Sequence, residues 1–230
     1  MLYQGFAKYF YNTWLKKMVK DLVVKPINSS DANVFIRRAH YSGKVVPNSQ
    51  LHFGVFLKNR LYGVMQFGPP MRKDFSIGLV KNTGWNEMME LNRMAFSNSL
   101  PKNSESRCLG VALKIIKKEY PHIKWVLTFA DGTQCGDGTI YRATNFKLTG
   151  IKKNDGIRRN PKTGEILTRM AAYHQLKSRE FQDEWEPLAG YQLRYIFFLN
   201  QESERDLTVP IIPFSKIKEF GAGMYLGKKT

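Results

Sequence analysis

The alternation of hydrophobic and polar residues predicts a chain that mixes helices with strands. Residues 51–68 alternate like two strands joined by Lys58-Asn59-Arg60, which predicts a β-hairpin. Before it, Ser30-Asp31 precedes an amphipathic stretch, so a capped helix is expected from about residue 30 to 40. Gly68-Pro69-Pro70 ends the hairpin, and a polar loop is expected to follow to about residue 86.

The same pattern continues through the middle of the chain. Residues 87–96 (EMMELNRMAF) fit a strand because they stand between two loops, and a helix is expected from about residue 105 to Tyr120, before Pro121. The remaining expected elements are a buried strand at 123–131, a short helix in TIYRATNF, a strand in KLTGIKK and a late strand in YQLRYIFFL. This order favours an α/β or α+β fold, with helices packed on a mixed sheet.

Length and composition fit one domain. A chain of 230 residues that is 43% hydrophobic and 13% aromatic can bury a substantial core. We expect a core from about residue 30 to 200, an N-terminal extension and a basic C-terminal tail. No apolar run approaches the ~18 residues of a membrane helix, so no membrane partner is expected. Cys108 and Cys135 give neither a disulfide framework nor a zinc spacing, which favours a cytoplasmic protein.

Charge is the strongest bulk signal. The chain has 36 basic and 19 acidic residues, a net charge of +17, which favours a polyanionic partner such as nucleic acid. Residues 147–179 hold nine basic and two acidic side chains, together with Gly, Asn and Pro suited to an adaptable loop. The stretch is interpreted as a nucleic-acid surface, with a solvated basic loop as the alternative. Its candidate DNA-binding residues are Lys152, Lys153, Arg158, Arg159 and Lys162.

The helix expected after residue 105 opens on Arg107-Cys108-Leu109-Gly110-Val111-Ala112, where a glycine costs roughly 1 kcal/mol relative to alanine. A strand, a polar loop and a helix in this order can hold a pyrophosphate, because unpaired amides and the helix dipole favour an anion at the helix start. Gly110 would allow close approach and Arg107 would add charge. Close packing is the alternative explanation of the glycine.

This arrangement resembles the GNAT acyltransferase superfamily, whose coenzyme A loop has the pattern matched here by Arg107-x-x-Gly110-x-Ala112. The resemblance extends to the next strand and to IYRATNFKLTG, where Asn145 takes the place of a glycine and is expected to tolerate a left-handed backbone. It implies that Tyr141 lies near the sulfur of coenzyme A and protonates the leaving thiolate. A tyrosine packed on the sheet is the alternative.

Longer strings resemble the phage Mom family of DNA modification proteins. They include HYSGKVVPNSQLHFGVF, GVMQFGPP, ELNRMAF, PKNSESR and WVLTFADGTQCGDGTIYRATNFKLTGIKK. The resemblance implies conversion of adenine in double-stranded phage DNA to a carbamoylmethyl form, in the host cytoplasm, as protection against host restriction. The target base would have to be flipped out of the duplex. The oligomeric state stays open, a dimer included.

The matched strings also carry the candidate catalytic residues. Glu90 and Arg93 are interpreted either as a salt bridge or as a pair that binds substrate and accepts a proton. Tyr41 is a candidate for stacking on the flipped base, with a place in the core as the alternative. The resemblance suggests iron, with His40 and Asp131 as ligands, whereas a helix-end His40 and a turn-forming Asp131 are the alternatives. The expected cofactor contacts are Ser104, Ser106, Arg107, Gly110 and Ala112, with plain helix capping as the alternative for one serine.

The chemistry of the product leaves the donor open. A carbamoylmethyl group is attached through its methylene carbon, whereas acyl transfer attaches a carbonyl carbon. The donor is therefore either acetyl coenzyme A with an activated methyl group, or another acyl or glycine-derived compound. The rival functions are a general GNAT N-acetyltransferase acting on a protein or RNA-associated amine, and a nucleic-acid binder without catalytic activity.

Overall fold

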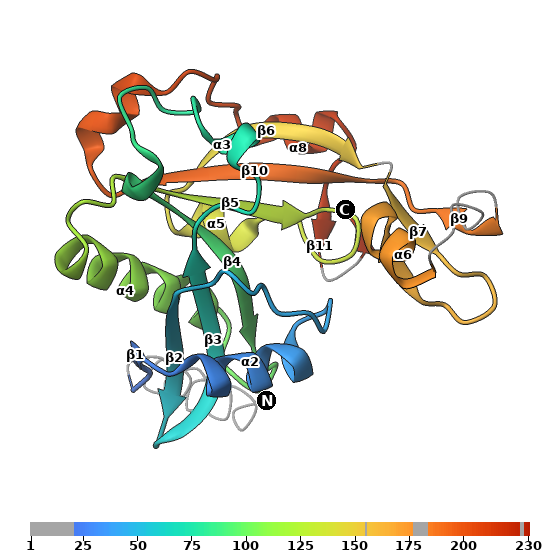
Figure 1. The fold of residues 1–230 in the computed structure, drawn as a ribbon, viewed down its shortest axis with the longest axis horizontal. Helices are drawn as coiled ribbons and strands as arrows, with labels where there is room; N and C mark the ends of the chain where they lie inside the picture. Colours follow the sequence, from blue (N-terminus) through green and yellow to red (C-terminus); the bar gives the residue numbers. More distant parts are fainter. Residues whose placement is uncertain (1–20, 155, 177–183, 226–227) are drawn as a thin grey trace, which may run out of the picture. The chain divides into compact units, whose positions relative to one another are not determined.

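The computed structural model describes residues 21–154, 156–176, 184–225 and 228–230 (Figure 1). Its strands are β1 (Val23–Pro26), β2 (Leu51–Leu57), β3 (Arg60–Gly68), β4 (Met88–Phe96), β5 (Trp125–Asp131), β6 (Lys147–Asn154), β7 (Ile157–Arg159), β8 (Ile166–Thr168), β9 (Glu186–Pro187), β10 (Gly190–Phe198), β11 (Met224–Tyr225) and β12 (Lys228–Lys229). Its helices are α2 (Ser29–Ala39), α3 (Lys73–Ser76), η1 (Trp85–Glu87), α4 (Ser104–Glu119), α5 (Thr139–Ala143), α6 (Arg169–Leu176), η2 (Gln201–Asp206) and α8 (Ser215–Glu219).

A mixed seven-stranded sheet organises these elements, in the order β1-β2-β3-β4-β5-β10-β6. The first four strands pair antiparallel, and β4 pairs with β5 in parallel. Because a parallel pair needs a crossover, the chain passes through α4 between β4 and β5. The expected mixed α/β fold with helices flanking a central sheet is confirmed.

The chain divides into two compact units. Of the described residues, those within 21–128, 140–147 and 196–209 form unit 1, and those within 129–139, 148–195 and 210–230 form unit 2. The single domain expected over the whole chain stays a prediction.

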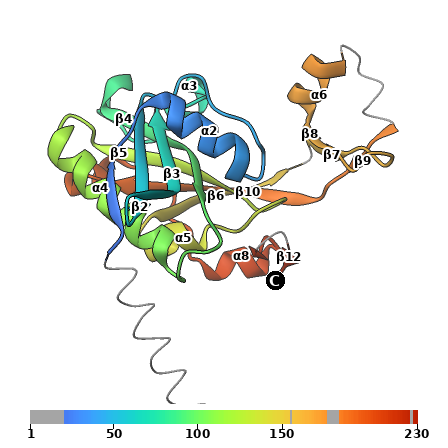
Figure 2. The ribbon, with the colours of Figure 1, turned by 90° about the horizontal axis from the view of Figure 1, so that it is seen from below.

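In unit 1, α2 and α4 lie on opposite faces of the strands (Figure 2). The side chains of Ala32 and Ile36 on α2 pack against Val64 of β3 and Ala95 of β4, all fully or almost fully buried. Asn28 caps α2, because its Oδ1 accepts the backbone N–H of Asp31 at 2.8 Å. The β2–β3 hairpin is confirmed, and Lys58 and Asn59 turn it with positive φ angles.

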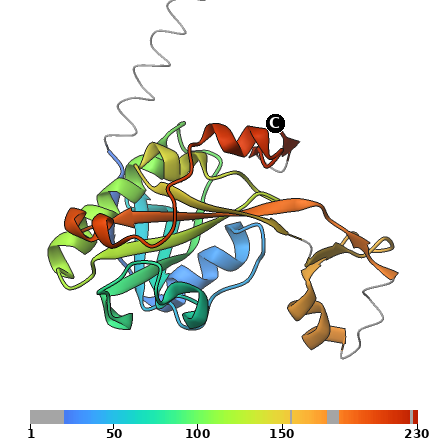
Figure 3. The same ribbon diagram turned by 90° about the horizontal axis from the view of Figure 1, so that it is seen from above.

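Unit 2 contains a three-stranded sheet in the order β8-β7-β9, followed along the chain from β8 by α6 (Figure 3). Leu167, Ala172 and Trp185 form a small buried cluster there. The adaptable loop expected in the basic stretch is therefore wrong: residues 157–176 are largely strand and helix, ordered by their own apolar contacts. The loop expected from residue 69 to 86 also differs, since it contains α3 and the start of η1.

No helix in the described part of the chain is long and apolar enough to cross a membrane.

Candidate functional site

A β-bulge in β4 brings Glu90 and Arg93 to one face of the sheet. Gln66 of β3 pairs with Arg93 and Phe67 pairs with Leu91, so Asn92 is the extra residue. In a regular strand, residues three positions apart point to opposite faces. Because of the extra residue, the side chains of Glu90 and Arg93 point to the same face of the sheet. The positive charge of Arg93 lowers the pKa of Glu90.

Glu90 is an almost fully buried carboxylate in this cluster, with 6% of its surface exposed. Its Oε2 accepts the backbone N–H of Met71 at 2.9 Å. Burial raises the pKa of Glu90, and this effect outweighs the hydrogen bonds and the charge of Arg93, which lower it. A carboxylate with a raised pKa next to a fixed cation is suited to accept a proton.

Arg93 is held in place by main-chain oxygens. Its Nε donates to the carbonyl of Lys44 at 2.9 Å, and Nη1 donates to the carbonyl of Asn92 at 2.7 Å. Burial lowers the pKa of Arg93, whereas Tyr41 and Glu90 raise it. The guanidinium is thus a positioned cation that interacts electrostatically with Tyr41 and Glu90.

His40 and Tyr41 complete the cluster at the end of α2. Their rings lie 4.3 Å apart between centroids, and Nδ1 of His40 accepts the backbone N–H of Ser42 at 3.2 Å. Burial, followed by the charge of Arg93, lowers the pKa of His40 to about 4, so the imidazole is neutral at neutral pH. His40 is also the C-cap of α2, as the helix-end alternative expected.

Buried polar residues in the adjoining strands accompany this cluster, and the sequence interpretation missed them. His52, Gln66 and Arg93 are paired across β2, β3 and β4, so they share one face. Nε2 of Gln66 donates to Oδ1 of Asn33 at 2.9 Å and lies 3.2 Å from Nδ1 of His52. Only the strand register reveals this row, because the three residues are far apart in the sequence.

A second candidate site in unit 1 is a pocket of about 520 Å³ beside α4. The pocket is lined along one side of the helix by Arg107, Gly110, Lys114 and Lys117. Asn145 also lines the pocket. A Cβ on Gly110 would meet no atom within 4 Å, so close packing does not explain this glycine. The spacing of the two lysines along the helix could have shown them from sequence.

The helix expected from about residue 105 is confirmed, whereas two of the predicted cofactor contacts do not line the pocket. Because α4 starts at Ser104, Gly110 lies in its second turn rather than its first. The Ser104 hydroxyl is fully buried and donates to the carbonyl of Pro101 at 2.6 Å, and Ala112 is fully buried. Ser106 lines the pocket with Arg107 and Gly110, whereas Ser104 and Ala112 do not.

Tyr141 lies in α5 and Asn145 follows the end of that helix, and both residues belong to unit 1. The Tyr141 ring lies 5.5 Å from that of Phe146, which lies 5.2 Å from that of Phe197. Asn145 has φ = +64°, which confirms the left-handed backbone expected there. Tyr141 is partly buried, and its role as an acid stays a prediction.

Asp131 lies in unit 2 and organises the turn that follows β5. Its carboxylate accepts the backbone N–H groups of Thr133 and Gln134, at 2.9 and 3.2 Å, and the side-chain amide of Gln134. This is the turn-forming alternative. His40 belongs to unit 1, and within the described residues no group of three or more His, Cys, Asp or Glu side chains could hold a metal ion. The expectation of iron is therefore without support.

The candidate DNA-binding residues all lie in unit 2. Lys152, Lys153, Arg159 and Lys162 are exposed, on β6, on β7 and in the turn after β7. Arg158 differs from them, because its Nη1 donates to the carbonyl of Trp185 at 3.0 Å and is part of the packing of the small sheet.

Together these features define a mixed α/β protein with a buried glutamate beside a half-buried arginine and histidine, and with a separate basic pocket on a helix. The chain belongs to the Mom protein family, whose model matches residues 21–216. It is 34% identical over 198 residues to the methylcarbamoylase Mom of Escherichia phage Mu, covering 84% of this chain and 81% of the relative.

Solved acetyltransferase structures also align with the chain. The ribosomal-protein-S18-alanine N-acetyltransferase of Escherichia coli is 11% identical, with a TM-score of 0.45 over 78% of this chain and 95% of that one. The spermidine/spermine N-acetyltransferase SpeG of Vibrio cholerae is 9% identical, with a TM-score of 0.49 over 82% and 98%.

Proposed function

We propose that this protein is a DNA modification enzyme that converts the exocyclic amine of adenine in phage DNA to a carbamoylmethyl form, protecting that DNA from host restriction. The observation that carries the proposal is membership of the Mom family, with 34% identity to the phage Mu methylcarbamoylase. The polar cluster around Glu90 and Arg93 lies within the matched residues and supports it.

The proposed step is a displacement at carbon. The N6 atom of adenine forms a bond to the methylene carbon of the donor, the leaving group departs with its bonding electrons, and N6 loses a proton. Glu90 is the proposed acceptor of that proton, since burial raises its pKa above the usual value of a glutamate. Arg93 is the proposed cation that orients the substrate, and Tyr41 is the proposed stacking partner of the base.

The α4 pocket is the proposed donor site. Arg107, Lys114 and Lys117 supply positive charge, and the bare backbone at Gly110 leaves space for a close ligand, so the residues present fit the pyrophosphate of coenzyme A. An acyl-coenzyme A bound there would supply an activated acyl group. Acetyl coenzyme A would need an oxidant that takes two electrons from its methyl carbon, and an amine nitrogen that replaces the thiolate at its carbonyl. A glycinamide-type donor with a leaving group on the methylene already carries the amide and needs no oxidant.

Unit 2 is the proposed DNA-binding part. Lys152, Lys153, Arg159 and Lys162 are exposed cations on or next to ordered strands, which suits contacts to backbone phosphates. Flipping the target base costs roughly a few kcal/mol, and such contacts offset that cost.

Mass spectrometry of deoxynucleosides tests the function. Plasmid DNA from bacteria expressing the protein should contain a deoxyadenosine heavier by one carbamoylmethyl group, and Tyr141→Phe tests the proposed acid. Feeding ¹³C-glycine or ¹³C-acetate identifies the donor by the label in the product. If cells that contain abundant, folded protein yield plasmid DNA without modified deoxyadenosine, the proposal is contradicted. That result would favour an acetyltransferase that acts on another substrate. Resistance of the modified plasmid to restriction enzymes tests the protective role.

A further inference from the structure

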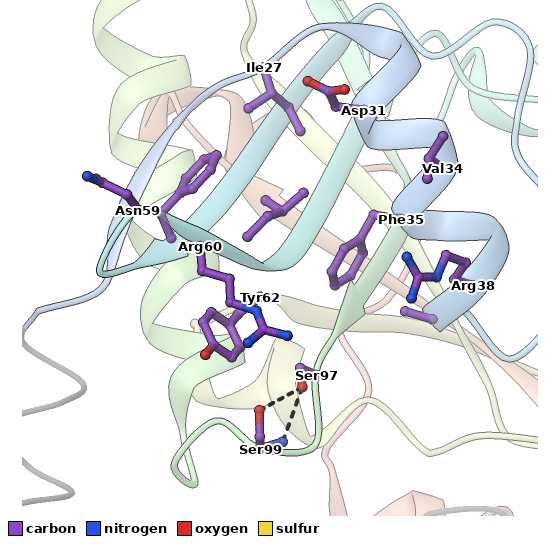
Figure 4. Close-up of a pocket in the computed structure, with 13 residues that line it drawn as sticks. Ile27, Asp31, Val34, Phe35, Arg38, Asn59, Arg60, Tyr62, Ser97 and Ser99 are labelled. Atoms are coloured by element: carbon purple, nitrogen blue, oxygen red, sulfur yellow. Dashed lines mark hydrogen bonds between the residues drawn. The ribbon is translucent and has the colours of Figure 1, made fainter.

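A groove of about 970 Å³ in unit 1 has no role in the proposed reaction (Figure 4). It lies between α2, the β2–β3 turn and the residues after β4, and it shares no lining residue with the α4 pocket. Phe35, Leu61 and Tyr62 are half-buried in it. Among the described residues, the groove therefore exposes aromatic and aliphatic surface that no other side chain fully covers.

Two arginines reach over this apolar surface from opposite walls. Arg38 comes from the last turn of α2 and Arg60 from the start of β3, and Figure 4 shows both guanidinium groups pointing across the groove. The guanidinium carbon of Arg60 lies 5.6 Å from the centre of the Tyr62 ring. Neither arginine has an ion pair or hydrogen bond to another described residue, so both are free to bind an anion.

The surroundings keep the groove positive. Among the described residues that line the groove, only Asp31 is acidic, and its carboxylate accepts the side-chain N–H of Asn28 at 2.9 Å. Lys25 adds a cation nearby, with Nζ 4.5 Å from the ring centre of Phe56. An anionic ligand is thus favoured over a cationic one.

Hydroxyl groups line the end of the groove beside Tyr62. The backbone N–H of Ser97 donates to the carbonyl of Tyr62 at 2.7 Å, which ties this turn to the strand that carries the ring. The hydroxyls of Ser97 and Ser99 lie 2.8 Å apart, and both residues line the groove. Hydroxyl donors close to a guanidinium are common partners of phosphate oxygens.

We propose that this groove binds an unpaired nucleotide of a nucleic-acid strand. The base stacks on the face of the Tyr62 ring that Arg60 does not cover, and Arg38 and Arg60 bind the flanking phosphates. Aromatic rings interleaved with arginines form the usual surface for single strands, because every base has a π-face and every linkage has a charge. The net charge of +17 favours such a strand over an uncharged partner. This site does not depend on the modification reaction.

Fluorescence anisotropy of the full chain with a short labelled single-stranded oligonucleotide tests the site, without any donor present. Tyr62→Leu should weaken binding roughly tenfold, and Tyr62→Phe should bind like the wild type because the ring remains. Arg38→Gln and Arg60→Gln should each lower the slope of log K against log salt by about 0.7. Arg37→Gln is the matched control, since Arg37 is exposed next to Arg38 but does not line the groove.

Wild-type affinity and salt slope in all the groove variants would overturn the proposal. So would loss of binding in Tyr62→Phe, because stacking does not need the hydroxyl. If the variants leave oligonucleotide binding unchanged and Val34→Asp alters the sedimentation coefficient, the groove is a protein interface and the proposal fails. Nucleoside analysis of plasmid DNA tests the modification reaction separately, so failure of one does not imply failure of the other.

Discussion

At the scale of single residues, burial and a neighbouring charge change the pKa of His40 strongly. Buried next to Arg93, its imidazole stays neutral to a pKa of about 4, whereas the unfolded chain protonates it near 6.5. The unfolded state therefore binds more protons between these values, and stability falls as pH drops through that range. Because Nδ1 of the neutral imidazole accepts the backbone N–H of Ser42, Nε2 carries the ring proton and can donate a hydrogen bond to a ligand.

Replacing His40 by Gln should remove this pH dependence. Between pH 6.5 and 4 the wild type is expected to lose about 3 kcal/mol more unfolding free energy than His40→Gln. Urea unfolding at several pH values measures the difference, with the exposed His122→Gln as control. Parallel pH profiles for His40→Gln and the wild type would show that His40 is not held neutral.

At the scale of elements, helix α4 contains Gly110, a weak helix former, on the side that faces the α4 pocket. Gly110 is in the second turn, where an added Cβ meets nothing, and the pocket residues Arg107 and Lys114 lie on the same side. The backbone of Gly110, which carries no side chain, therefore faces the pocket and does not pack against another element.

Gly110→Ala should stabilise the protein by roughly 0.5–1 kcal/mol, because alanine is the better helix former and no clash opposes it. The same change should weaken binding of labelled coenzyme A, since the methyl group occupies the approach to the helix. Thermal unfolding and equilibrium dialysis measure the two effects. If the Gly110→Ala variant is more stable but binds coenzyme A like the wild type, Gly110 is not part of the donor site.

The turn between α5 and β6 depends on a left-handed residue. Asn145→Ala should cost about 1 kcal/mol of unfolding free energy, whereas Asn145→Gly should be neutral or stabilising, because only alanine is strained at φ = +64°. Denaturant midpoints of the two variants provide the comparison. An alanine variant as stable as the glycine variant would contradict this account of the turn.

Local patterns predict the hairpin, β4 and α4 well, since turn residues, alternation and proline act over a few positions. The Asn92 bulge is different. It depends on the register between β3 and β4, and without it Glu90 and Arg93 would face opposite sides. The row through His52 and Gln66 has the same origin. The basic stretch resembles a loop in sequence because its strands are only three residues long, and their packing on Trp185 depends on residues distant along the chain.

At the scale of the whole molecule, positive charge is distributed over both units. Unit 2 carries the exposed cations Lys152, Lys153 and Lys162, whereas unit 1 carries the basic α4 pocket. Charge on its own attracts any polyanion, and the ordered strands of unit 2 give its cations fixed positions.

Lys152→Gln/Lys153→Gln should weaken binding to duplex DNA of any sequence and lower the salt slope by up to about 1.8, at roughly 0.9 for each phosphate that the variant no longer neutralises. Anisotropy with labelled duplexes at several salt concentrations measures this. Lys118→Gln is the control, because Lys118 is exposed on α4 and pairs with Glu119. If the double variant has the same slope of log K against log salt concentration as the wild type, Lys152 and Lys153 do not contact the DNA.

The central claim is that the cluster around Glu90 performs a DNA modification. The most direct measurement is the amount of modified deoxyadenosine in plasmid DNA from cells expressing the wild type, Glu90→Gln or Arg37→Gln. Glu90→Gln should fold at least as stably at neutral pH, because burial disfavours the charged carboxylate whose pKa it raises. The account predicts modified deoxyadenosine with the wild type and Arg37→Gln and none with Glu90→Gln. Wild-type yield from Glu90→Gln would contradict it.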